Sequence, residues 1–240
     1  MISSQDGTQE GVVARGALRP ALEAPVDQAG GALMLAQDRQ KDSRQNRGVF
    51  ARLAYRAVAI DAAFDLHDRI ADSLTPARFS SHPLETMGID LQTPEGFDAL
   101  VPKTGPLVVV CNHPYGAIDG LAAVALLEQR RADVKVLANH LLGKLPGYRR
   151  YLLPLDVLST TQEARARNIA SLRAAMAWLK AGRTLILFPA GEVAHFDWKA
   201  RRVVESPWSE HAARLARRAG ASVLPLYFAG HNRKRFHAAG

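Results

Sequence analysis

The chain has 240 residues, 48% of them hydrophobic, which is enough for one well-buried core. It carries 31 Lys and Arg against 23 Asp and Glu. This excess of basic side chains lies entirely after residue 45, because residues 1–45 hold five basic and six acidic side chains. Cys111 is the only cysteine, which excludes a disulfide framework and a thiolate metal cage. A basic body is typical of proteins that bind nucleic acid, an anionic membrane or an anionic ligand, and also of an Arg-rich composition without such a role.

No stretch reaches the roughly 20 apolar residues that a membrane-spanning helix needs. The N-terminus also lacks the basic-then-apolar order of a secretory signal. We therefore expect a cytoplasmic protein.

Residues 1–45 are polar and lack clear periodicity, which predicts a flexible tail. Residues 46–83 form a second region. Within it, residues 49–74 contain no Gly or Pro and space large apolar side chains at helical intervals. This pattern predicts an N-terminal helical segment, which either docks on the core or lies on a membrane surface.

In residues 84–240, short apolar runs alternate with amphipathic stretches. Strands are expected at 106–111, 133–138, 184–189 and 222–228, and helices at 120–131, 160–182 and 209–220. In the longest helix, Thr160 and Glu163 have the spacing of a capping box. Its predicted buried face consists of Ile169, Leu172, Met176 and Leu179. The alternation predicts an α/β domain with a mainly parallel or mixed central sheet flanked by helices.

Unusual residues follow three of these strands: Asn112-His113, then Pro189 to Glu192, and finally Ala229-Gly230. The carboxyl ends of parallel strands meet at one edge of a sheet, where ligands collect. We therefore expect a functional site at this edge.

His113 and Asp119 are the strongest catalytic candidates. On one continuous helix they would point about 120° apart, at ~100° per residue. Pro114 and Gly116 instead predict a turn, after which Asp119 can reach the imidazole. A carboxylate on Nδ1 would leave Nε2 to accept a proton from a substrate hydroxyl. The same residues also fit a purely structural helix cap. No G-x-S-x-G sequence occurs, so a substrate nucleophile, and hence acyl transfer, is favoured over serine hydrolysis.

Three segments in this order resemble the glycerolipid acyltransferase superfamily, that of the 1-acylglycerol-3-phosphate acyltransferases. "NHPYGAIDG" (112–120) resembles the first block, H-x4-D, and "LILFPAGEVAHF" (185–196) is similar to the third, F-P-E-G-T-R-S. "SVLPLYFAG" (222–230) resembles the fourth. The H-x5-D spacing and F-P-A-G-E-V look closer to a bacterial lysophospholipid acyltransferase or hemolysin-like branch, some of whose related domains acylate lyso-ornithine lipids. The resemblance covers roughly residues 84–230.

This resemblance implies an O-acyltransferase that moves a fatty acyl group from acyl-CoA or acyl-carrier protein to a lysolipid hydroxyl. The acceptor would be a lysophospholipid or a lyso-ornithine-type lipid, with His113 as general base and Asp119 as its orienting partner. Glu192 and the Gly191 backbone would lie at the acceptor or oxyanion side of the cleft. It also implies peripheral contact with the inner face of the cell membrane. The residues expected to bind substrate at the strand ends are Asn112, Gly116, Pro189, Gly191 and Glu192. For Asn112, a role that only holds the turn is also open.

The sequence departs from the superfamily at its arginines. Val193 stands at the arginine of the third block and Val157 at that of the second, while Ala190 replaces the glutamate. The superfamily associates both arginines with the acceptor phosphate, through the bidentate fit of guanidinium to phosphate oxygens. Arg149 and Arg150 could take over this contact, or could be surface residues. The chain ends soon after the fourth block, so the domain at 84–240 is expected to be shortened at its C-terminus.

Other features leave alternatives open. Trp198 and Trp208 flank a basic loop that covers the cleft, touches lipid headgroups or is ordinary surface. A catalytically inactive lipid-binding protein of the same fold and a nucleic-acid-binding module are the competing function classes. The one basic cluster with an aromatic, "HNRKRFH" (231–237), is short, so no nucleic-acid partner is expected. The histidines show no zinc-binding spacing, so neither a metal nor a cofactor beyond the acyl donor is expected.

Overall fold

The protein is described by a computed structural model that places residues 12–14, 68–69, 78–145, 147–157 and 159–232. Most of the predicted tail and of the predicted N-terminal helical segment lies outside these residues, so the division into domains stays a prediction. Val12–Ala14, within the predicted tail, forms strand β1 and pairs in parallel with β8.

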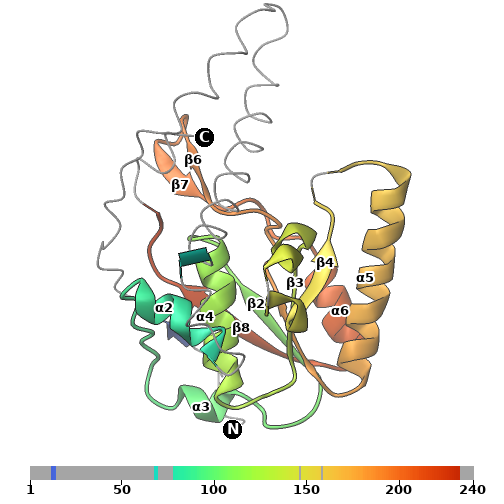
Figure 1. The fold of residues 1–240 in the computed structure, drawn as a ribbon, viewed down its shortest axis with the longest axis horizontal. Coiled ribbons are helices and arrows are strands. Elements are labelled where there is room, and N and C mark those ends of the chain that lie inside the picture. The colour runs from blue at the N-terminus through green and yellow to red at the C-terminus, as the bar shows by residue number, and fades with distance from the viewer. Residues whose placement is uncertain (1–11, 15–67, 70–77, 146, 158, 233–240) are drawn as a thin grey trace, which may run out of the picture.

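A parallel sheet forms the centre of the described structure, with the strand order β1-β8-β2-β5-β3-β4 (Figure 1). Its other strands are β2 (Leu107–Cys111), β3 (Val134–Asn139), β4 (Leu152–Leu155), β5 (Thr184–Leu187) and β8 (Ser222–Phe228). The prediction of a mainly parallel α/β sheet is confirmed. Because β8, β2 and β5 are neighbours, the three strand ends that carry the sequence motifs lie side by side.

Helices cover both faces of this sheet. The helix α4 (Ala117–Glu128) packs on one face, in a core with Val109 and Ile186. The helices α5 (Gln162–Lys180) and α6 (His211–Ala219) pack on the other, in a core with Val108 and Leu185. Successive strand residues point to opposite faces, so the continuous apolar runs of β2 and β5 serve two cores at once.

The remaining elements are short. They are α2 (Ser81–Thr86), α3 (Phe97–Leu100), the 3-10 helices η4 (His140–Lys144) and η5 (Tyr148–Arg150), and an antiparallel hairpin of β6 (His195–Asp197) and β7 (Arg202–Val204). Among the helices that the structure describes, none is long and apolar enough to cross a membrane.

The structure corrects two details of α5. The helix is capped by Thr161, whose side chain accepts from the Ala164 N–H at 3.2 Å, so the predicted capping box at Thr160 is wrong. Ile169, predicted to be buried, is 50% exposed. The helix instead turns Ser171 inward, because its hydroxyl donates to the carbonyl of Pro154 at the edge of the sheet. That rotation leaves Ile169 on the solvent side.

Strand β4 was missed by sequence analysis. Its four residues include Pro154, and a proline argues against a strand in the interior of a sheet. In the structure β4 is the edge strand and pairs only with β3 among the described strands. A proline is tolerated there because one side of the strand needs no ladder hydrogen bonds.

Candidate active site

His113 and Asp119 meet at the carboxyl end of β2. The Nδ1 atom of His113 lies 2.9 Å from Oδ2 of Asp119. Between them the chain reverses at Gly116, whose φ of +83° is a conformation that side-chain-bearing residues rarely adopt. Asp119 lies in the first turn of α4, so the turn that the sequence predicts between the two residues is confirmed. Their catalytic roles stay a prediction.

The Asp119 carboxylate organises this turn. Its Oδ2 accepts the backbone N–H groups of Tyr115 at 2.9 Å and Gly116 at 3.0 Å, besides contacting the imidazole. The side chain is only 1% exposed. Burial raises the pKa of Asp119, and the hydrogen bonds from His113, Tyr115 and Gly116 oppose that rise. A carboxylate only accepts hydrogen bonds, so an ionised Asp119 holds the proton of His113 on Nδ1 and leaves Nε2 free of it.

A second segment of the chain holds the backbone of His113. The His113 N–H donates to Oε1 of Glu205 at 2.6 Å, and the His113 carbonyl accepts the Ala194 N–H at 2.8 Å. The imidazole also packs on the Phe188 ring, with 4.2 Å between the ring centroids. Glu205 was missed by sequence analysis, since it lies 92 residues from His113 and belongs to none of the recognised motifs.

A cavity of about 380 Å³ opens beyond the carboxyl ends of the strands. Five of the predicted site residues line it together: His113, Gly116, Pro189, Gly191 and Glu192. The rest of the lining is mostly apolar and comes from both faces of the sheet, including Tyr148 near α4 and Leu172 of α5. A cavity of this kind suits a ligand with a long apolar part.

The motif after β5 supplies one rim of the cavity. Glu192 is half-buried there, and its Oε1 accepts a hydrogen bond from the hydroxyl of Ser206. The N–H of Gly191 donates to the Phe188 carbonyl at 2.9 Å and closes a tight turn in which Gly191 has a φ of +72°. This N–H is therefore already used within the turn, which weakens the expectation that it serves a reacting oxyanion.

Asn112 makes its contacts away from the cavity. Its Nδ2 donates to the Phe228 carbonyl at 2.9 Å, and its Oδ1 accepts the Phe228 N–H at 2.7 Å. The side chain thus continues the hydrogen-bond ladder between β2 and β8 past the end of β2. This contact favours the structural reading of Asn112, as a residue that fixes the strand ends beside His113.

Arg149 and Arg150, proposed from the sequence as substitutes for the missing arginines, are not among the described residues that line the cavity. Arg149 donates to the carbonyl of Gly143 at 2.7 Å. Arg150 pairs with Glu128 at 2.9 Å, at the last residue of α4 and therefore at the opposite end of that helix from Asp119. The structure does not bring either guanidinium to His113.

The positions of the two missing arginines do line the cavity. Val157 follows β4 and Val193 follows the turn at Gly191, and both are lining residues. Their side chains offer no charge to an acceptor headgroup. The two positions at which this sequence lacks the arginines of the superfamily therefore lie on the cavity lining.

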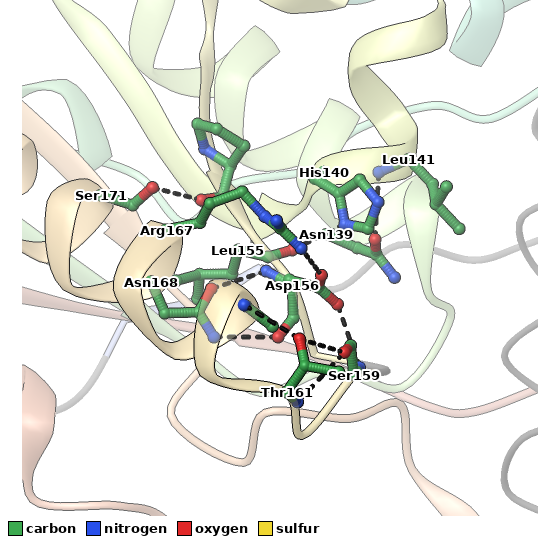
Figure 2. A network of polar contacts seen from close by, with 12 residues as sticks. Asn139, His140, Leu141, Leu155, Asp156, Ser159, Thr161, Arg167, Asn168 and Ser171 are labelled. Atoms are coloured by element: carbon green, nitrogen blue, oxygen red, sulfur yellow. Dashed lines mark hydrogen bonds and ion pairs between the residues drawn. The ribbon is translucent and has the colours of Figure 1, made fainter.

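The wall that carries Val157 is held by a polar network between the end of β4 and α5 (Figure 2). Asn168 accepts the Asp156 N–H at 2.7 Å and donates to the Asp156 carbonyl at 2.9 Å. The buried Asp156 carboxylate accepts from Arg167 at 2.7 Å and from the Ser159 N–H at 3.0 Å. These bonds fix the backbone that leads into Val157.

Comparison with known proteins accords with this geometry. A family model described as Acyltransferase matches residues 96–229, more than half of the chain. The chain belongs to the Acyltransferase family. The resemblance to glycerolipid acyltransferases that the motifs indicate is thereby confirmed.

Two curated acyltransferases are similar in sequence to this chain. The chain is 27% identical over 146 residues to a lyso-glycine lipid O-acyltransferase of Phocaeicola vulgatus, and the match covers 57% of this chain and 47% of the relative. It is 28% identical over 146 residues to a protein of the same description from Bacteroides thetaiotaomicron, with 57% and 48% covered. The chain thus spans about half the length of these acyltransferase relatives.

Cys111 does not compete with His113 as a reactive group. It is fully buried at the end of β2. Burial raises its pKa well above the ordinary value, and the negative charges of Asp119 and Glu205 add to the rise. A thiol in this setting stays protonated and is a poor nucleophile.

Proposed function

We propose that the chain is an O-acyltransferase that moves a fatty acyl group to the hydroxyl of a lysolipid. The observation that carries this proposal is that His113, on the lining of a mostly apolar cavity, is hydrogen-bonded to the buried carboxylate of Asp119. The pair offers a base with a defined tautomer, and the cavity offers apolar surface for alkyl chains. Membership of the Acyltransferase family supports the same reaction class.

In the proposed reaction, Nε2 of His113 takes the proton of the acceptor hydroxyl while the hydroxyl oxygen attacks the thioester carbonyl of the donor. The tetrahedral intermediate then collapses, the carbon–sulfur bond breaks, and the imidazolium returns its proton to the departing thiolate. The products are the acylated lipid and the free thiol of the carrier. Asp119 stabilises the imidazolium and prevents the ring from rotating. The donor would be acyl-CoA or acyl-carrier protein.

For the acceptor, we infer a lysolipid with an amino-acid headgroup, of the lyso-ornithine or lyso-glycine type, in preference to a lysophosphatidic acid. Val157 and Val193 support this inference, because they place apolar side chains where a phosphate would need guanidinium groups. The relatives named for lyso-glycine lipid support it as well. Such an acceptor resides in a bilayer, so the protein would act peripherally at the inner face of the cell membrane.

The test is transfer by the purified full chain. Vesicles containing a lyso-glycine lipid, a lyso-ornithine lipid or lysophosphatidic acid are each offered labelled acyl-CoA or acyl-carrier protein. We expect transfer to an amino-acid lysolipid, and a loss of about 10³-fold or more in the His113→Ala variant. The matched control is His231→Ala, which removes an exposed histidine outside the cavity lining.

Transfer by His113→Ala at the wild-type rate would contradict the assigned base. Absence of transfer to every acceptor, together with lysolipid binding that His113→Ala retains, would favour the catalytically inactive lipid-binding protein.

A further inference from the structure

The hairpin of β6 and β7 has a tip whose turn is closed by hydrogen bonds from its own backbone. Its strands pair His195 with Val204 and Asp197 with Arg202. The Oδ1 atom of Asp197 accepts the N–H groups of Lys199 at 2.8 Å and Ala200 at 3.1 Å, which ties the turn to the end of β6. These hydrogen bonds lower the pKa of Asp197, so the tie persists in mildly acidic solution. The backbone of the tip is therefore held in a defined turn, from which its exposed side chains project.

The tip combines one large aromatic side chain with three cations. Trp198 is 72% exposed, the highest value among the large hydrophobic residues that the structure describes, and its one described ring contact is with Phe196. Lys199, Arg201 and Arg202 are exposed around it. Within the described part of the chain, none of the three forms an ion pair. Tryptophan beside lysine and arginine is the composition of segments that sit at the membrane–water interface.

The hairpin also stands at the mouth of the cavity. Glu192 and Val193, just before β6, and Ser209, in the segment between β7 and α6, all line it. Ala194 and Glu205, at the two ends of the hairpin, hold the backbone of His113. Figure 1 shows β6 and β7 projecting beyond the sheet on the side where α4 begins, which is the side of His113. A flat surface that meets the tip would therefore face the cavity entrance.

We propose that the tip of this hairpin, residues 198–202, docks the protein on a lipid surface with anionic headgroups. Trp198 inserts at the level of the headgroups, and Lys199, Arg201 and Arg202 neutralise lipid phosphates or carboxylates. The proposal rests on the proposed function in one respect, that the acceptor resides in a bilayer, and it assigns the surface through which that bilayer is met.

The experiment measures co-sedimentation of the full chain with phosphatidylcholine vesicles that contain either no anionic lipid or about one third phosphatidylglycerol. We expect binding to the anionic vesicles. The affinity of the variant K199Q/R201Q/R202Q for these vesicles should be about a hundredfold lower at low salt, because each cation near such a surface contributes roughly 1 kcal/mol to binding. Trp198→Ala should weaken binding less, and its loss should persist in high salt, where charge contributions are screened.

Matched controls remove exposed cations and an exposed apolar side chain near the other end of the strands, away from the hairpin. K180Q/R217Q/R218Q deletes three exposed cations from the last turns of α5 and α6, and Leu100→Ala deletes an exposed apolar side chain on α3. Both should bind vesicles as the wild type does. Circular dichroism and thermal melting check that every variant folds.

Wild-type protein that does not bind anionic vesicles would overturn the proposal, as would equal losses in the hairpin and control variants. Tighter binding to a nucleic-acid duplex than to vesicles, abolished by the hairpin variant, would assign the tip to nucleic acid instead. Hairpin-dependent vesicle binding without transfer to any lysolipid would uphold the docking surface while the proposed function fails.

Discussion

On one side of the cavity, the turn between β2 and α4 is held by hydrogen bonds that converge on a single buried carboxylate, that of Asp119. On the other side, the loop between β4 and α5 is held by Asn168 and Arg167, which reach back from the helix to Asp156. The first arrangement leaves a proton-accepting nitrogen on the cavity lining. The second arrangement presents Val157, which carries no polar group. Under the proposed function, the first wall would carry out the chemistry and the second would select the acceptor headgroup.

Replacing Asp119 should have the largest effect. The variant Asp119→Asn keeps an oxygen for the N–H groups of Tyr115 and Gly116, but its amide no longer forces the proton of His113 onto Nδ1. We expect kcat to fall by about 10² to 10⁴-fold with little change in KM for the acceptor. Asp98→Asn, an exposed aspartate in the first turn of α3, is the matched control. An unchanged kcat in Asp119→Asn would remove the orienting role.

The same variant tests the burial of the charge. Folding raises the pKa of Asp119 above its ordinary value of 3.8, so the folded chain holds this proton more tightly than the unfolded chain does. The free energy of unfolding of the wild type, measured relative to Asp119→Asn, should therefore fall as pH rises from about 4 through the raised pKa, and then level off. Urea unfolding at a series of pH values measures it. A relative stability that rises with pH would show a lowered pKa.

Introducing the missing charges should change the second wall. The double variant V157R/V193R places guanidinium groups at the two cavity positions where the superfamily carries them. We expect the ratio of kcat/KM for lysophosphatidic acid to that for an amino-acid lysolipid to rise by about 10 to 100-fold, the range of a charge-assisted hydrogen bond. The variant V157Q/V193Q adds polar bulk without charge and should not reproduce the shift. An equal loss on both acceptors would indicate that these positions do not select the headgroup.

Glu205 connects the first wall to the hairpin. Glu205→Gln retains an oxygen for the His113 N–H but loses the charge, so we expect about a tenfold loss in kcat or less. Glu205→Ala should lose more, because the N–H is then left without its partner. Glu210→Gln, an exposed glutamate just before α6, is the control. Equal activity of Glu205→Ala and the wild type would mean that Ala194 alone suffices to hold the His113 backbone.

The smallest effect is expected at Asn168. Asn168→Ala removes two hydrogen bonds to the backbone of Asp156 and should lower the free energy of unfolding by about 1–3 kcal/mol. Activity should fall only a few-fold, through KM for the acceptor, because His113 is untouched. Gln162→Ala removes an exposed amide from the same helix and serves as control. A fall in kcat without a change in KM would place Asn168 closer to the chemistry than the structure does.

Much of the first wall could be predicted from sequence, because its parts are local. The apolar run of β2, the Pro114–Gly116 turn and Asp119 lie within thirteen consecutive residues (107–119), and short-range sterics force their geometry. The second wall resisted prediction. Strand β4 contains a proline, which its place at the edge of the sheet accommodates, and α5 is rotated so that a serine faces inward. Both depend on which neighbours pack against the element.

The sequence by itself determined the alternation of strands and helices, the turn that joins His113 to Asp119, and the absence of arginine at two expected positions. The tertiary structure decided that β8, β2 and β5 lie side by side, that Glu205 reaches His113 from 92 residues away, and that Arg149 and Arg150 point to other partners. The physical reason is range. Backbone sterics and hydrophobic periodicity act over a few residues and can be read along the chain, whereas strand order and long-range hydrogen bonds follow from the simultaneous burial of both faces of the sheet.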